Sequence, residues 1–179
     1  MKNILRHLKA GIIIVLFLII AFGSGDSGSK NSNAVAKPVG IGQAGRTEYF
    51  EIMVNKVELN ERVRTGNQFA NLKAEPGNMY LIFNVTFKNV DNESRMFSEG
   101  DILINYNGKD YTFDHPEMVM LEGWGTFLDQ INPLTTKSTN LVYKIPSEII
   151  GDIFWRPGRN SNDLMFLLGN KKAEPQSEK

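Results

Sequence analysis

Cysteine is absent from this chain of 179 residues. The fold therefore holds no disulfide, no thiolate metal ligand and no cysteine nucleophile, and no residue can receive a thioether-linked lipid. Export usually permits disulfides, so an exported form of this chain must be stabilised by its hydrophobic core alone.

An excess of charge of either sign is also lacking, since Lys and Arg total 20 and Asp and Glu total 20. Three basic residues, Lys2, Arg6 and Lys9, lie before an apolar run, so the rest of the chain carries a formal charge of −3. Nucleic-acid binding needs clustered basic side chains. We therefore expect no nucleic-acid partner.

Histidine is scarce, and only one of the two, His115, lies beyond the basic N-terminal residues. No G-x-S-x-G motif occurs, and a Ser-His-Asp arrangement has only His115 available. We expect the protein not to be an enzyme and to have no catalytic residue and no cofactor. One enzymatic alternative remains: a hydrolase that uses two carboxylates brought together in a cleft by the fold.

After the N-terminal run, no long segment repeats apolar residues with the helical period of 3.6. Apolar and polar residues alternate instead, as in strands. In the clearest strand, Met79–Val90, every second residue from Leu81 to Phe87 is apolar. Such alternation predicts an antiparallel sheet with one buried and one solvated face. The face that we expect in solvent carries Tyr80, Ile82, Asn84, Thr86 and Lys88.

Several further strands are predicted around this one. A strand over Tyr49–Leu59 changes phase halfway, which predicts a β-bulge at Asn55-Lys56. Asn107-Gly108 predicts a tight hairpin between strands over Asp101–Tyr106 and Lys109–Phe113. The remaining strands are expected at 138–145, 152–155 and 163–168. About seven antiparallel strands over residues 47–169 predict an all-β, immunoglobulin-like β-sandwich.

The N-terminus predicts export. A basic head precedes residues 10–22, a run of 13 residues without a charged or strongly polar side chain. This run suits a signal peptide better than a spanning helix, which needs roughly 20 residues. Residues 1–23 are therefore expected to be a signal peptide cleaved after Gly23, or else an N-terminal anchor that contacts the membrane through residues 10–22. Either alternative places the remaining chain outside the cytoplasm.

Polar segments flank the predicted sandwich. Residues 24–46 are rich in Gly, Ser and Asn and contain no aromatic residue, so we expect a flexible tether. Residues 170–179 are expected to form a disordered tail.

The strand and hairpin segments resemble a known family. In order they read "NMYLIFNVTFKNVDNES", "ILINYNGKDYTF", "INPLTTKSTNLVYKIPSE" and "DLMFLLGN". This series is similar to the exported domain-of-unknown-function 4352 family, related in fold to the mycobacterial immunoprotective secreted antigen. The resemblance covers about residues 47–169 and implies an immunoglobulin-like sandwich. It implies no catalytic residue, and the lipid-attachment cysteine of many members is missing here.

Candidate binding residues gather in the segment from Phe113 to Asp129, which holds His115, Met118, Met120 and Trp124. Trp124 lies between two glycines, which suits either a contact residue or a cap on the sandwich core. His115 with Met118 and Met120 has the ligand types of a Cu(I) site. Carboxylates near turns, such as Asp91 with Glu93, are open as a calcium site.

These observations lead to one expected function and one alternative. We expect a non-catalytic binding module outside the cytoplasmic membrane, whose partner is an envelope protein or an extracellular ligand. The alternative is a small-ligand or metal-binding sensor or chaperone that uses residues 113–129.

Overall fold

A computed structural model of the chain describes residues 37–125, 130–158, 161 and 163–172. The predicted signal or anchor at 1–23, residues 24–36 of the predicted tether, and residues 173–179 lie outside the described residues. Within the described part no helix forms, and hence none that is long and apolar enough to span a bilayer.

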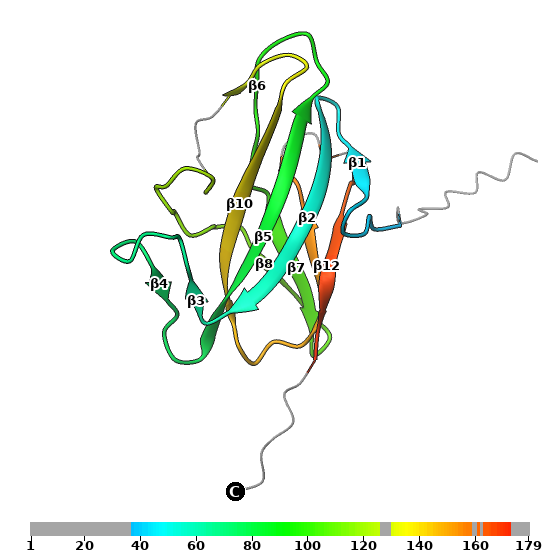
Figure 1. Cartoon of the computed structure of the whole chain (residues 1–179). Helices are drawn as coiled ribbons and strands as arrows, with labels where there is room; N and C mark the ends of the chain where they lie inside the picture. The colour runs from blue at the N-terminus through cyan, green and yellow to red at the C-terminus, as the bar shows by residue number, and fades with distance from the viewer. Residues whose placement is uncertain (1–36, 126–129, 159–160, 162, 173–179) are drawn as a thin grey trace, which may run out of the picture. The chain divides into compact units, whose positions relative to one another are not determined.

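Two antiparallel four-stranded sheets form a β-sandwich (Figure 1). The first sheet has the order β1-β2-β5-β10 and the second has the order β12-β11-β7-β8. The first sheet comprises β1 (Ala44–Arg46), β2 (Phe50–Asn60), β5 (Asn78–Asn89) and β10 (Thr136–Pro146). The second comprises β7 (Asp101–Tyr106), β8 (Lys109–Phe113), β11 (Gly151–Arg156) and β12 (Phe166–Lys171). The predicted fold class is confirmed.

Two short pairs of strands lie outside the main sheets. β3 (Arg62–Val63) pairs with β4 (Leu72–Lys73), and β6 (Arg95–Met96) pairs with β9 (Gln130–Ile131). The β3–β4 pair belongs to residues 61–74, which we call the 61–74 hairpin.

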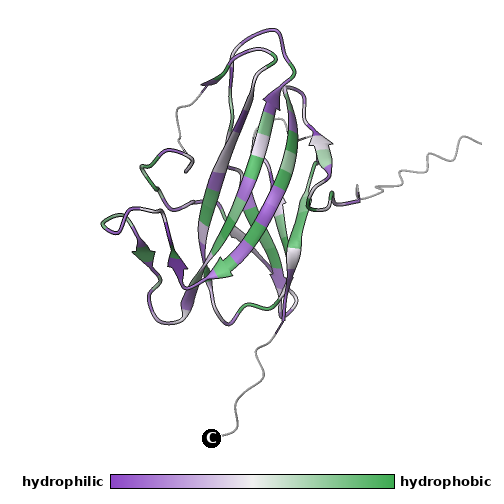
Figure 2. Ribbon diagram, viewed as in Figure 1, coloured by the Kyte–Doolittle hydropathy of each residue, from purple (hydrophilic) through white to green (hydrophobic). Residues whose placement is uncertain are grey.

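The main core lies between the two sheets because the strands alternate as the sequence predicts. Figure 2 shows this alternation as bands along β2 and β5. Leu81, Phe83, Val85 and Phe87 of β5 are all buried. In β2 the register shifts between Val54 and Lys56, which confirms the predicted bulge. The β7–β8 hairpin has the predicted bounds and turns at Asn107-Gly108.

The ends of the folded region differ from the prediction. Residues 37–46, placed in the tether from their composition, belong to the sandwich. β1 pairs with β2 through three residues, and Val39 forms a bridge with Phe166 of β12. At the other end, the strand predicted at 163–168 is shifted to Phe166–Lys171, so its last two residues fall in the expected tail. Small and polar residues at a sheet edge carry no apolar signal, so composition alone misplaced both boundaries.

The expectation that the second face of β5 is solvated is wrong for two of its residues. Tyr80 is only 5% exposed and Ile82 only 9%. Both belong to a second apolar cluster with Val63, Val119 and Val142, on the face of the first sheet that points away from the main core. We call this face the outer face. Residues from far along the chain cover it, which alternation within one strand cannot reveal.

Candidate functional site

The segment with the predicted binding residues lies along the edge strand β10 of the first sheet. Backbone hydrogen bonds join Glu117 N to the Val142 carbonyl oxygen at 2.7 Å and Gly125 N to the Asn140 carbonyl oxygen at 2.9 Å. A third bond returns from Asn140 N to the Gly123 carbonyl oxygen at 2.9 Å. Residues 116–125, which we call the 116–125 loop, are therefore fixed to the sheet.

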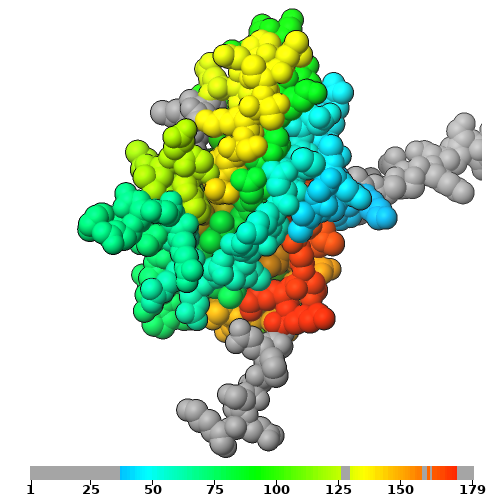
Figure 3. Space-filling model, viewed as in Figure 1, coloured from blue at the N-terminus to red at the C-terminus, as the bar shows by residue number. Residues whose placement is uncertain are grey.

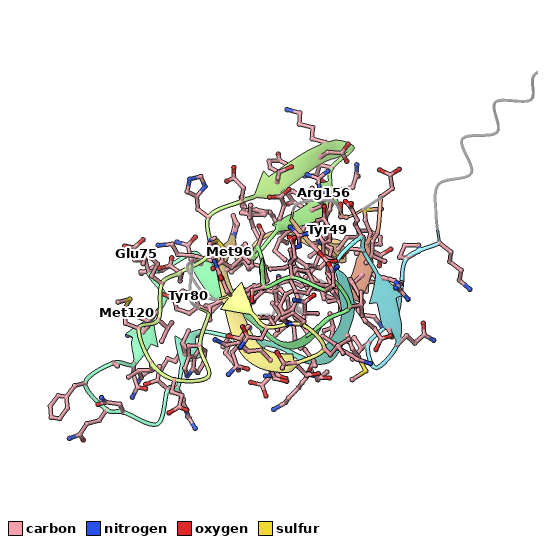
Figure 4. All side chains as sticks on the ribbon, turned by 90° about the horizontal axis from the view of Figure 1, so that it is seen from above. Tyr49, Glu75, Tyr80, Met96, Met120 and Arg156 are labelled. Carbon is pink, nitrogen blue, oxygen red and sulfur yellow. The ribbon has the colours of Figure 1, made fainter. Side chains whose placement is uncertain are left out.

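Three of the four predicted binding residues point into solvent. The His115 side chain is 91% exposed and its Nδ1 contacts the carboxylate of Asp114. That contact lowers the pKa of the Asp114 carboxyl group. Met118 and Met120 are 60% and 84% exposed, and Figure 4 shows Met120 at the periphery, farther out than Tyr80.

The calcium alternative finds no cluster of ligands in the described part of the chain. No three His, Asp or Glu side chains there converge closely enough to hold a metal ion. Asp91, the candidate for calcium, instead contacts the guanidinium of Arg95, and this contact lowers the pKa of its carboxyl group.

Trp124 is partly covered and partly accessible, so both alternatives for its role stay open. It is half-buried and packs against the second apolar cluster. A β-bridge to Asn140 fixes its backbone against β10. It also lines two hollows on the outer face, one on each side of it. The side chain is thus held in place and still accessible.

The first hollow has a volume of about 780 Å³ and lies between Trp124 and the start of the 61–74 hairpin. Its floor includes Ile82 of β5. Figure 3 looks onto this face, on which the 61–74 hairpin and the 116–125 loop project one above the other. The lining residues are Glu58, Leu59, Asn60, Glu61, Arg62, Arg64, Ile82 and Trp124.

Two arginines of the first hollow are available for a ligand. Arg62 and Arg64 are both exposed and flank the fully buried Val63. Neither guanidinium forms a hydrogen bond or an ion pair with the described part of the chain. By contrast, Glu58 on the same side contacts Lys56 and accepts a hydrogen bond from Asn60.

The second hollow, of about 550 Å³, lies on the other side of Trp124. The 116–125 loop contributes residues 120–124, and β10 contributes Lys137, Ser138 and Thr139. Its lining includes one acidic side chain, Glu122, and one basic side chain, Lys137.

A row of amides and hydroxyls crosses the outer face beside Trp124. Asn55 Nδ2 donates to Asn84 Oδ1 at 2.7 Å and to Thr86 Oγ1 at 2.8 Å. Asn84 Nδ2 donates to Asn140 Oδ1 at 2.9 Å, and the Thr86 and Ser138 hydroxyl oxygens lie 2.7 Å apart. These bonds fix the orientation of each group, and we call these five residues the polar row.

Comparison with known proteins places the sandwich in a family. The sequence profile described as "Domain of unknown function (DUF4352)" matches residues 39–150. The chain belongs to this family. The match begins at Val39, which agrees with the early start of the sandwich. Among curated proteins, none matches the chain.

Solved structures with the same fold share little sequence with this DUF4352 chain. An uncharacterized β-sandwich protein from Clostridium difficile 630 is 19% identical, with a TM-score of 0.52 over 74% of this chain and 95% of that one. A conserved hypothetical protein from Bacillus anthracis is 18% identical, with a TM-score of 0.53 over 74% of this chain and 96% of that one. These likenesses show the fold alone.

Burial raises the pKa of three groups in this DUF4352 domain, Tyr80, Glu99 and Tyr143. Tyr80 belongs to the second apolar cluster on the outer face, whereas Glu99 and Tyr143 do not line either hollow. Burial raises the pKa of the Glu99 carboxyl group, which borders a crevice of only about 10 Å³ under the 116–125 loop. Burial also raises the pKa of the Tyr143 phenol far above its usual value. Tyr143 and Trp155 lie in the main core, where both side chains hydrogen-bond to backbone carbonyl groups.

Sequence reasoning identified Trp124 but missed its surroundings in the DUF4352 domain. Arg62 and Arg64 are distant from Trp124 in sequence, and only the hairpin brings them to the same hollow. Asn84 and Thr86 interrupt the apolar pattern of β5, and that interruption was the available signal. A polar pair on the outer face of a central strand marks where the covering segments end.

Proposed function

We propose that this domain is a non-catalytic binding module that works outside the cytoplasmic membrane. Its binding surface is the outer face of the first sheet, with Trp124 at its centre. The observation that carries the proposal is that two hollows, of about 780 and 550 Å³, share Trp124 as a common wall. Both volumes fall within the range of small-molecule sites.

The binding surface is built before a ligand arrives, which supports this proposal. Its walls are attached to the sheet by backbone hydrogen bonds of the 116–125 loop and by the apolar cluster to which Val63, Val119 and Ile82 all belong. A surface that is already ordered loses little conformational entropy on binding. Rigid aromatic side chains such as Trp124 are typical contact residues in such surfaces.

The absence of catalysis is proposed on the placement of the titratable groups. Active sites gather groups with shifted pKa values in a cleft. Here the raised pKa values belong to Glu99 under the loop and to Tyr143 and Tyr80, which are buried in the two apolar clusters. In the first hollow the contact with Lys56 lowers the pKa of Glu58, as expected for an ion pair at the protein surface. The acidic and basic side chains in the hollows are instead mostly exposed.

The place of action is proposed from the N-terminal sequence. Lys2, Arg6 and Lys9 precede the apolar residues 10–22, the order found in secretory signals and in N-terminal anchors. The folded domain would then meet an envelope protein or an extracellular ligand.

Affinity capture from bacterial envelopes tests this proposal. We expect the immobilised protein to retain envelope material, and Trp124→Ala to reduce the retained amount at least about tenfold, as hot-spot aromatics do. Tyr111→Ala is the matched control, because Tyr111 is a 39% exposed aromatic residue on β8 of the opposite sheet. Equal capture by wild type and Trp124→Ala would show that the outer face is not the binding surface.

A further inference from the structure

The groups around Trp124 also indicate what kind of ligand the outer face takes. We infer that it binds an uncharged glycan chain, with one sugar ring packed on Trp124 and its neighbours in the two hollows. This inference rests on the proposed binding function and adds the chemical class of the ligand.

The balance of charge in the hollows favours an uncharged ligand. The first hollow has two acidic residues, Glu58 and Glu61, and two basic residues, Arg62 and Arg64. The second has Glu122 and Lys137. Each lining therefore sums to a formal charge of zero, and Glu58 is in addition paired with Lys56. Neither hollow gathers the large excess of one sign that recruits a polyanion or a polycation.

The polar row favours a ligand that is rich in hydroxyl groups. Asn, Ser and Thr side chains both donate and accept hydrogen bonds. Asn84 Oδ1 keeps an acceptor lone pair beyond the bond that it accepts from Asn55. The Thr86 hydroxyl keeps either a lone pair or its own hydrogen, because either hydroxyl can be the donor in its bond with Ser138. A vicinal pair of sugar hydroxyls can bond to such a fixed row without displacing its internal bonds.

The position on a sheet face disfavours an extended peptide. Peptides that add to a sheet use the free backbone groups of an edge strand. The polar row lies on β2, β5 and β10, and β2 and β5 are each paired on both sides. A ligand there meets side chains only, so its own hydrogen-bonding groups must suit amides, hydroxyls and the guanidinium groups of Arg62 and Arg64.

Trp124 supplies the remaining element of sugar recognition. One side of a pyranose ring is a patch of C–H groups, which packs on the flat indole while the hydroxyls at the ring edge reach polar neighbours. Because Trp124 separates two hollows, the sugar on it has space for a neighbour on each side. This geometry favours a chain over a single sugar.

Titration of the full-length protein with defined oligosaccharides tests the inference. The uncharged probes are hexamers of N-acetylglucosamine, glucose and mannose, and the charged probes are hexamers of galacturonate and of glucosamine. Trp155 is fully buried, so a change of tryptophan fluorescence reports Trp124, and calorimetry gives the affinity. We expect at least one uncharged hexamer to bind, and to bind more tightly than both charged hexamers.

Variants locate the site. Trp124→Ala should weaken binding of that hexamer at least about tenfold, and Arg64→Ala should weaken it severalfold, whereas Tyr111→Ala should leave it unchanged. Arg64 is exposed and has no side-chain partner in the described residues, so its variant tests the site even where Trp124→Ala impairs folding. If Arg64→Ala and a folded Trp124→Ala both bind the hexamer with unchanged affinity, the inference is overturned.

Two results separate the ligand class from the proposed function. Trp124-dependent capture of envelope material, with no binding of any uncharged hexamer or with tighter binding of a charged one, would reject the glycan and keep the binding face. If the wild-type protein captures no envelope material and binds no hexamer, the binding face is rejected, and with it the inference.

Discussion

Gly100 lies where two buried aromatic side chains meet the backbone. The Trp155 indole donates to the Glu99 carbonyl oxygen at 2.6 Å, and the Tyr143 hydroxyl lies 2.8 Å from the Gly100 carbonyl oxygen. Gly100 has a φ of +75°, and a Cβ atom added there would lie 2.2 Å from the Arg156 carbonyl oxygen. No other residue fits without movement of the backbone.

Gly100→Ala is therefore expected to destabilise the fold by about 3 kcal/mol or more, at the upper end of the usual range for single substitutions. Gly77→Ala is the matched control, because Gly77 has a φ of +83° and nothing within 4 Å of the added Cβ. That change should cost only the backbone term of about 1–2 kcal/mol. Urea unfolding of both variants measures the difference, and equal losses would mean that the close contact with Arg156 has no effect.

Single residues also show what sequence can and cannot indicate about the candidate site. Trp124 stood out because a large aromatic between two glycines is unusual, and the structure places it between two hollows. His115, Met118 and Met120 stood out for their chemistry, but ligand types in sequence say nothing about where their side chains point. Whether these side chains converge depends on the path of the loop, and that path is fixed by backbone hydrogen bonds to β10.

At the scale of the element, β2 depends on one inserted residue. Val54 pairs with Val85 and Lys56 pairs with Asn84, so Asn55 is the extra residue of the bulge. The insertion keeps Val54, Val57 and Leu59 on the inner side of a strand whose simple alternation would separate them.

Deletion of Asn55 should leave a regular strand with the same pairing. We expect the variant to fold with a loss of about 1–2 kcal/mol, because only the Asn55 amide bonds to Asn84 and Thr86 disappear. Deletion of Met53 is the control, since it moves Ile52 and Phe50 to the outer face. Burial of two such side chains is worth about 4 kcal/mol. Thermal unfolding distinguishes the two deletions, and similar losses would contradict the assigned register.

Elements with a strong local pattern were predictable. The bulge of β2, the bounds of β7 and β8, and the extent of β5 follow from alternation and turn residues. The cover over Tyr80 and Ile82 was not predictable, because Val63 and Val119 come from short segments without a pattern of their own. The sequence of a half-polar strand face predicts exposure to solvent whether or not another segment covers that face.

At the scale of the whole molecule, the segment at the start of the sandwich joins its two sheets. Val39 N donates to the Met165 carbonyl oxygen and the Val39 carbonyl oxygen accepts from Leu167 N, both at 2.8 Å. A few residues later β1 pairs with β2. The segment before residue 47 therefore contacts β12 of one sheet and β2 of the other. Gly45 lies against Leu164 and Phe166, where a Cβ atom would be within 3.0 Å of both side chains.

Two fragments separate this structural boundary from the one that composition predicts. A fragment of residues 37–172 should unfold at the same urea concentration as the full chain, because every residue of the main core lies within it. A fragment of residues 47–172 loses the Val39 bonds and β1, a set of roughly five backbone hydrogen bonds worth about 1 kcal/mol each. We expect it to be less stable by about 3–5 kcal/mol and to expose the edge of β2 to aggregation. Equal midpoints for the two fragments would mean that residues 37–46 are an accessory segment and that the sandwich is stable from residue 47 onward.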